Sequence, residues 1–177
     1  VDLTVPDGQM VALVGPSGSG KDSLLAALRQ PGDELRFWFM TSAAQVTDVH
    51  TATGAAVLAL VETPLGVVRA EEIASAPGCT GMMWGAEDLL AAMGGSTSRF
   101  STAEAGGPRV AGEYRDVPRH ARARVALAAA AFGRWAVDSV HLDIADEAGQ
   151  RAEALDAVAL GFVGTACIHP SQVAVVR

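Results

Sequence analysis

The sequence of 177 residues contains few cysteines, a single lysine and no long apolar run. Its two cysteines, Cys79 and Cys167, provide neither a disulfide framework nor a Cys-x-x-Cys metal site. No stretch approaches the roughly 18 apolar residues that cross a bilayer, so we expect no membrane partner. The net charge of −7 leaves no basic excess for binding nucleic acid. Because no basic leader with an apolar stretch behind it opens the sequence, we expect a cytoplasmic location.

Apolar segments of strand length alternate with segments typical of helices. Half of the residues are apolar and 19% are charged, a composition that supports a buried core. Strands are predicted over 10–14, 36–40, 57–61, 80–84, 137–142 and 162–168, and helices over 23–30, 70–75, 88–93, 120–134 and 146–160. Strands that are apolar throughout and separated by helices indicate an α/β fold with a parallel sheet covered on both faces.

Acidic residues and a histidine follow the apolar strands, at the ends where α/β folds carry their chemistry. These residues are Glu62, Glu87, Asp88, Asp143 and His169. Neighbouring strands of a sheet lie about 5 Å apart, so Glu62 and Asp88 can hold one Mg²⁺ that keeps positions open for water or substrate. Such a metal stabilises the enolate formed when a carbon–carbon bond breaks. Asp88 can equally be a helix N-cap, since an apolar helical run follows it.

Four later segments resemble those of a known family. They read ALVETPLGVVRAEEIA, TGMMWGAEDLLAAMGG, YRDVPRHARARVALAAAAFGRWAVDSVHLDI and CIHPSQVAVVR. Through them, residues 41–177 resemble the citrate lyase β-subunit-like CoA-ester lyases, which are Mg²⁺-dependent aldolases of the phosphoenolpyruvate-utilising barrel superfamily. The family fold is an eight-stranded βα barrel, and the resemblance covers only its later strands. Because counterparts of the first strands are missing, the lyase site of this chain can be inactive.

The resemblance also assigns roles to individual residues. It implies Glu62 and Asp88 as the catalytic Mg²⁺ ligands and places Pro64 to Gly66 in a loop over the metal. It places His169, Pro170 and Ser171 near the acyl-CoA. From the sequence alone, His169 can be either a base or a structural hydrogen-bonding residue. The arginines of the helical segment, Arg115, Arg119, Arg122 and Arg124, can contact CoA phosphates or form a solvated helix edge paired with Glu113 and Asp116.

A glycine-rich loop near the start carries a different signal. Residues 15–21, GPSGSGK, match the G-x-x-x-x-G-K phosphate loop and stand between a predicted strand and a predicted helix. Asp22 occupies the position where Ser or Thr usually holds Mg²⁺. The first 36 residues resemble the ribose bisphosphate kinases of phosphonate metabolism, which have an Asp at this point. That resemblance implies ATP as a ligand of Gly15, Gly18, Ser19, Gly20, Lys21, Asp22 and Ser23.

Together these observations predict an incomplete TIM-type (β/α) barrel of about six parallel strands with flanking helices. Residues 1–40 form a phosphate-loop unit, and residues 41–177 form the later part of a lyase-type barrel. The predicted function is a Mg²⁺-dependent carbon–carbon lyase acting on a CoA ester, with an acyl-CoA or 2-keto acid as substrate. A homo-oligomer would cover the open sheet edge. The alternatives are a phosphate-loop nucleotide-binding protein or small-molecule kinase, and a truncated or fused fragment without enzymatic activity.

Overall fold

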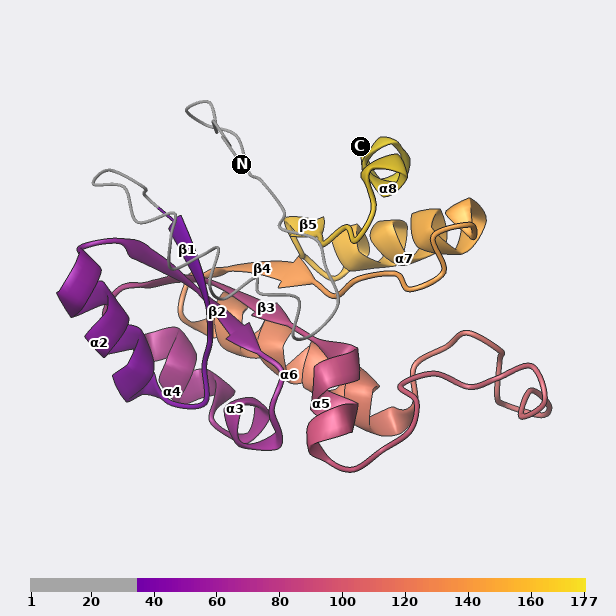
Figure 1. Cartoon of the computed structure of the whole chain (residues 1–177), viewed down its shortest axis with the longest axis horizontal. Coiled ribbons are helices and arrows are strands. Elements are labelled where there is room, and N and C mark those ends of the chain that lie inside the picture. Colours follow the sequence, from indigo (N-terminus) through magenta and orange to yellow (C-terminus); the bar gives the residue numbers. More distant parts are fainter. Residues whose placement is uncertain (1–34) are drawn as a thin grey trace.

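The computed structural model describes residues 35–177, which contain a parallel sheet of five strands (Figure 1). The strands are β1 (Leu35–Phe39), β2 (Ala56–Val61), β3 (Cys79–Trp84), β4 (Trp135–Asp138) and β5 (Gly164–Thr165). Their order in the sheet follows their order in the chain. Each crossover therefore advances the sheet by one strand in the same direction, which is the winding of a (β/α) barrel. The strand predicted over 10–14 and the whole phosphate loop lie outside the described residues.

Helices connect the strands. They are α2 (Ala43–Thr53), α3 (Pro64–Val68), α4 (Ala70–Ser75), α5 (Ala86–Ala92), α6 (Asp116–Ala131), α7 (Glu147–Ala159) and α8 (Pro170–Val176). Helices α2, α4 and α6 lie side by side along one face of the sheet (Figure 1). The core between them and the strands is built mostly of small and medium apolar side chains, with Trp84 as its largest buried member. No helix within residues 35–177 is long and apolar enough to cross a membrane.

Two helices that the sequence analysis did not predict begin at capping boxes. At the start of α2, the side chain of Ser42 accepts from the backbone N–H of Gln45, and the Gln45 side chain accepts from the Ser42 N–H. Helix α8 begins with the same reciprocal pair, formed by His169 and Gln172. Each box satisfies amide groups that a helix start otherwise leaves without a partner. These short, polar helix starts therefore form in spite of weak apolar periodicity.

Five predicted elements agree closely with the structure. The strands over 36–40, 57–61 and 80–84 and the helices over 70–75 and 146–160 are found with bounds that differ by one residue at most. The strand predicted over 137–142 was misplaced, because β4 already ends at Asp138. The strand predicted over 162–168 was too long, since β5 has two residues. Phe162 still closes α7 through its N–H to the Ala157 carbonyl, and the chain beyond Thr165 already leads into the cap of α8.

Candidate functional site

The carboxyl ends of β2 and β3 bring Glu62 and Gly85 into contact. Glu62 follows β2 directly and is buried, with 8% of its surface exposed. Gly85 follows β3, and its amide donates to the Val61 carbonyl at 3.3 Å. A Cβ atom on Gly85 would overlap the Oε2 atom of Glu62. Glycine at this position therefore leaves the space in which the Glu62 carboxylate lies.

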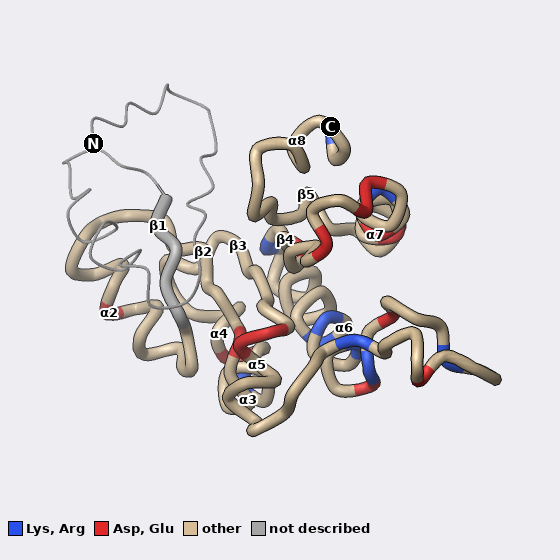
Figure 2. Tube along the Cα trace, turned by 45° about the vertical axis from the view of Figure 1, so that its right-hand side comes forward, with Lys and Arg blue, Asp and Glu red and all other residues tan. Residues whose placement is uncertain are grey.

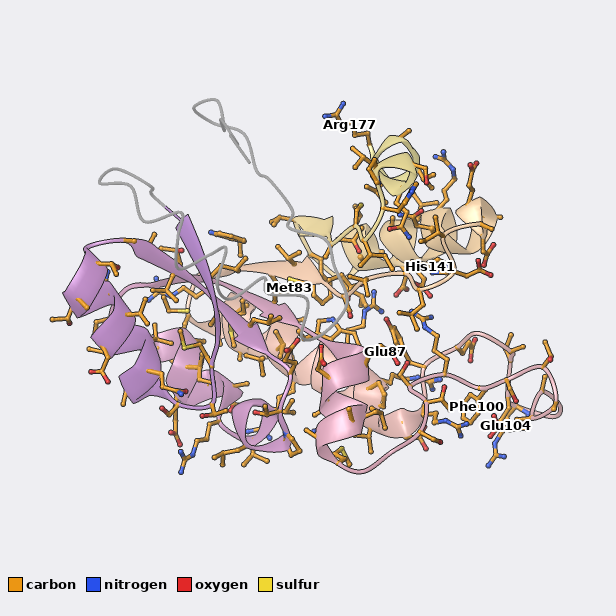
Figure 3. All side chains as sticks on the ribbon, viewed as in Figure 1. Met83, Glu87, Phe100, Glu104, His141 and Arg177 are labelled. Atoms are coloured by element: carbon orange, nitrogen blue, oxygen red, sulfur yellow. The ribbon has the colours of Figure 1, made fainter. Side chains whose placement is uncertain are left out.

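Asp88 lies on the first turn of α5, three residues after Gly85. The residue that caps this helix is Gly85, so the alternative role of Asp88 as a helix N-cap was wrong. The Asp88 side chain is exposed, whereas the neighbouring Glu87 accepts a hydrogen bond from the hydroxyl of Ser98. Figure 3 shows Glu87 at the end of α5 that lies beside the sheet. The helix start thus leaves Asp88 as its solvent-accessible carboxylate.

Residues 64–66 form the first turn of α3. Thr63 caps this helix by accepting from the Gly66 N–H at 3.1 Å, and Pro64 occupies the first turn, where its missing N–H costs nothing. A Cβ on Gly66 would lie 2.7 Å from the Met40 carbonyl oxygen, so this turn packs closely against the end of β1. The segment expected over the metal is therefore a rigid turn that starts two residues after Glu62.

His169, Pro170 and Ser171 form the start of α8, after β5. The Nδ1 atom of His169 accepts from the Ser171 amide at 3.2 Å and lies 2.8 Å from the Ser171 hydroxyl. Pro170 is the first helical residue, and all three residues are exposed. These contacts support the structural interpretation of His169 as a capping residue. A role of this turn in binding acyl-CoA stays a prediction.

A buried charged network that the sequence analysis missed lies at the end of β4. The Asp138 carboxylate accepts from Trp84 Nε1 at 2.6 Å, from the Ser139 amide at 2.9 Å and from the Arg122 guanidinium at 2.6–3.1 Å. Burial lowers the pKa of Arg122, but hydrogen bonds to Asp138 and Asp156 outweigh it and raise that pKa overall. The misplaced strand prediction hid this site, because it put Asp138 inside a strand rather than at its end.

The remaining arginines of α6 and its start are also engaged in ion pairs. Arg115 pairs with Glu104 at 2.7 Å, Arg119 with Glu113 at 3.5 Å and Arg124 with Glu71 at 2.7 Å. Figure 2 shows the basic residues of α6 with acidic segments around them. This pairing favours the interpretation of a structural, partly solvated edge over one of free phosphate ligands. Of the two acidic partners expected, Glu113 is found.

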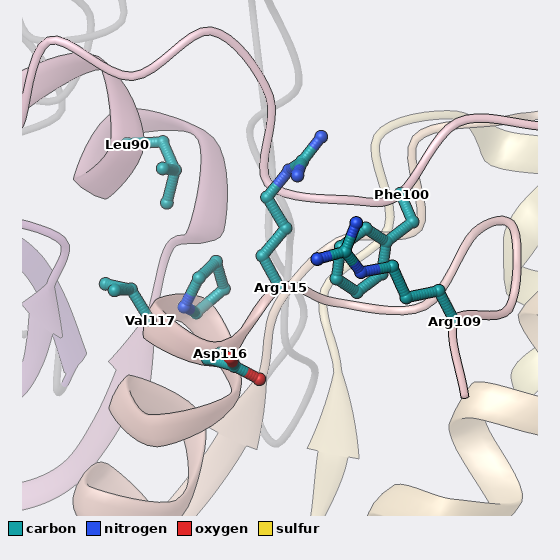
Figure 4. A pocket seen from close by; sticks show the side chains of 7 residues that line it. Leu90, Phe100, Arg109, Arg115, Asp116 and Val117 are labelled. Atoms are coloured by element: carbon teal, nitrogen blue, oxygen red, sulfur yellow. The ribbon is translucent and has the colours of Figure 1, made fainter. Parts of the chain in front are cut away.

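An open pocket of about 300 Å³ lies between helices α5 and α6 and their long connection. Its lining residues are Leu90, Phe100, Arg109, Arg115, Asp116, Val117 and Pro118 (Figure 4). The guanidinium carbons of Arg109 and Arg115 lie 5.3 and 4.9 Å from the centre of the Phe100 ring. The pocket combines apolar walls with two cationic groups, one of which is already paired with Glu104.

The proposed metal site at the sheet edge has two carboxylate side chains, those of Glu62 and Asp88. Across residues 35–177 no group of three or more His, Cys, Asp or Glu side chains gathers in a way that could hold a metal ion. Mg²⁺ is usually bound through one or two carboxylates, with water and substrate oxygens completing its octahedron. Glu62 and Asp88 are hard oxygen donors of that kind, and Gly85 leaves room for the first of them. The residues present therefore fit Mg²⁺ with an open coordination sphere.

Comparisons with known proteins show which family the chain belongs to. Residues 20–170 match the family model described as HpcH/HpaI aldolase/citrate lyase. A citrate lyase subunit beta-like protein of Mycobacterium tuberculosis is 55% identical over 136 residues, which cover 77% of this chain and 45% of that protein. The mitochondrial citramalyl-CoA lyase of Mus musculus is 30% identical over 126 residues, covering 66% and 33% of the two chains.

A solved structure gives the same result. CitE of Mycobacterium tuberculosis in complex with magnesium, acetoacetate and coenzyme A aligns with a TM-score of 0.75 and 47% identity, covering 93% of this chain and 57% of that one. The chain spans less than half the length of the two curated relatives. The comparisons give no support to the kinase resemblance of the first residues. They confirm the other resemblance: the chain belongs to the HpcH/HpaI aldolase/citrate lyase family.

Proposed function

We propose that this chain provides the Mg²⁺ site of a carbon–carbon lyase that acts on a CoA ester. The observation that carries the proposal is the buried Glu62 carboxylate, seated against Gly85 beside the helix start that bears Asp88. Family membership supports it, as do the names of a citramalyl-CoA lyase and of a CitE complex with magnesium, acetoacetate and coenzyme A among the similar proteins.

Glu62, which follows β2, and Asp88, on the first turn of α5, would hold the metal. When bound, Mg²⁺ supplies positive charge that stabilises the negative charge developing on the substrate as its carbon–carbon bond breaks. Glu62 is buried and Asp88 is exposed, so a metal ion held by both would stay accessible to the substrate. The substrate would be an acyl-CoA or a 2-keto acid, whose oxygens can complete the coordination sphere.

The neighbouring turns would shape the space around that substrate. Pro64 to Gly66 begin two residues after Glu62 and are fixed by the Thr63 cap. His169, Pro170 and Ser171 begin the last helix at the same edge of the sheet, where their exposed polar atoms can contact the CoA portion. The open edge of the parallel sheet would pair with a second copy, and a single monomeric species in light scattering would contradict that homo-oligomer.

The test is Mg²⁺ binding measured by titration calorimetry, followed by cleavage of a citramalyl-CoA-type 3-hydroxyacyl-CoA. Asp88→Asn and Glu62→Gln should each weaken Mg²⁺ binding at least tenfold, because each removes one anionic ligand. The matched control is Glu72→Gln, which removes an exposed carboxylate from α4. Wild-type Mg²⁺ affinity in Asp88→Asn would show that Asp88 is not a ligand, and an absence of binding in the wild type would refute the proposed site.

A further inference from the structure

Helix α5 begins at the proposed metal site without a side-chain cap of its own. Its N-cap residue is Gly85, which has no side chain to accept a hydrogen bond from an amide of the first turn. Ser, Thr, Asp or Asn would normally do so. None of these residues fits here, because any Cβ on Gly85 would overlap the Glu62 carboxylate. The observed position of the Glu62 carboxylate therefore excludes a side-chain cap at position 85.

Ser139, the residue after β4, provides an acceptor for the first amide of α5. Its Oγ accepts from the Ala86 amide, the first of α5, at 3.3 Å. Ser139 and Ala86 are both buried, with 5% and 2% of their surfaces exposed. Without this bond, the Ala86 N–H would be a buried donor lacking its partner, which is costly. The residue after β4 thus satisfies the first amide of a helix whose N-cap residue has no side chain.

Ser139 is itself held in place from two further sides. Its amide donates to Asp138 Oδ1 at 2.9 Å, and its carbonyl accepts from the Thr165 hydroxyl at 2.8 Å. Asp138 in turn is fixed by Trp84 and Arg122. The acceptor for α5 is therefore joined to β3, β5 and α6 through short hydrogen bonds.

We propose that Ser139 is a positioning residue for the metal site, one that sets the place of Asp88 relative to Glu62. The inference rests on the proposed function. Asp88 lies two residues after Ala86 on the same helical turn, so a displacement of the Ala86 amide moves the Asp88 carboxylate with it. Glu62 does not move with that turn, because it follows β2. The separation of these two carboxylates therefore depends on Ser139. Because metal–ligand distances tolerate changes of only a few tenths of an ångström, a small change in that separation weakens metal binding.

The experiment compares two substitutions at Ser139, one that removes its hydroxyl acceptor and one that weakens it. Ser139→Ala removes the acceptor for Ala86, and Ser139→Cys keeps the shape with a much weaker acceptor. Thr165→Val is the matched control, because it removes the bond to the Ser139 carbonyl and leaves the Ala86 bond intact. Mg²⁺ affinity is measured by calorimetry, and amide exchange of residues 86–92 is measured without metal.

We expect Ser139→Ala and Ser139→Cys to weaken Mg²⁺ binding about tenfold, as loss of an outer-shell contact does, and to speed exchange at the start of α5. Thr165→Val should do neither. Wild-type affinity in both Ser139 variants overturns the inference, and so does faster exchange across the whole sheet without a change confined to α5. If Asp88→Asn loses Mg²⁺ while the Ser139 variants keep it, the proposed function stands and only the inference fails. If the wild type binds no Mg²⁺, both fail.

Discussion

Arg122 joins two carboxylates that differ greatly in exposure, and removing it should destabilise the protein strongly. The side chain of Asp138 is 7% exposed and that of Asp156 is 59% exposed, while Arg122 itself is 13% exposed. Arg122→Met keeps most of the apolar stem but leaves the Asp138 charge buried, with only Trp84 and the Ser139 amide as donors. Removing one partner of a buried pair costs about 3–5 kcal/mol.

We expect a loss of about 3 kcal/mol, at the lower end of that range, because two donors to Asp138 remain. For a chain of this size, such a loss lowers the melting temperature by about 6–12 °C. Asp156→Asn breaks the exposed pair on the same guanidinium and should cost less than about 1 kcal/mol. The assay is urea unfolding followed by circular dichroism and by tryptophan fluorescence, since Trp84 lies in the network.

A double-mutant cycle tests the physical reason. If the cost comes from an unpaired buried charge, Asp138→Asn should recover part of the lost stability in the Arg122→Met background, because it removes that charge. Equal losses in Arg122→Met and Asp156→Asn, or a loss below about 1 kcal/mol in Arg122→Met, would refute the argument that burial makes the Asp138 pair the important one.

Two further predictions follow from the site and from the long loop. Gly85→Ala places a Cβ on the Glu62 carboxylate and should lower Mg²⁺ affinity by tenfold or more while far-ultraviolet circular dichroism stays unchanged; wild-type affinity would contradict this seat for Glu62. Hydrogen bonds from the Ser101 amide and Arg115 lower the pKa of Glu104 from 4.5 to about 2. These contacts should therefore be complete above about pH 4.5 and be lost as the pH falls through 2, and a carbon-13 titration midpoint of Glu104 near 4.5 would rule this out.

Parts of the fold could be predicted because their signals are local. The strands β2 and β3 are short runs that are apolar almost throughout, and helix α4 begins with two glutamates that favour a helix start. Helix α2 could not be predicted from periodicity, since only Val46 of its residues is fully buried. Its signal was the spacing of Ser42 and Gln45, which marks a capping box. The end of β4 is fixed by the contacts of Asp138 with other elements, which no local pattern contains.

In the candidate site, too, the sequence could identify the proposed ligands, which follow strands, but not the residues that position them. Glu62 and Asp88 could be proposed because an acidic residue after an apolar strand is a local signal. Their support is not local: Trp84 and Asp138 are 54 residues apart, and Ala86 and Ser139 are 53 apart. The position of the Glu62 carboxylate requires glycine at position 85, which leaves α5 without a side-chain cap, and the first amide of that helix is bonded by Ser139, the residue after β4. The geometry of the site thus depends on residues far from its ligands in the sequence, and the spacing of the ligands cannot identify those residues.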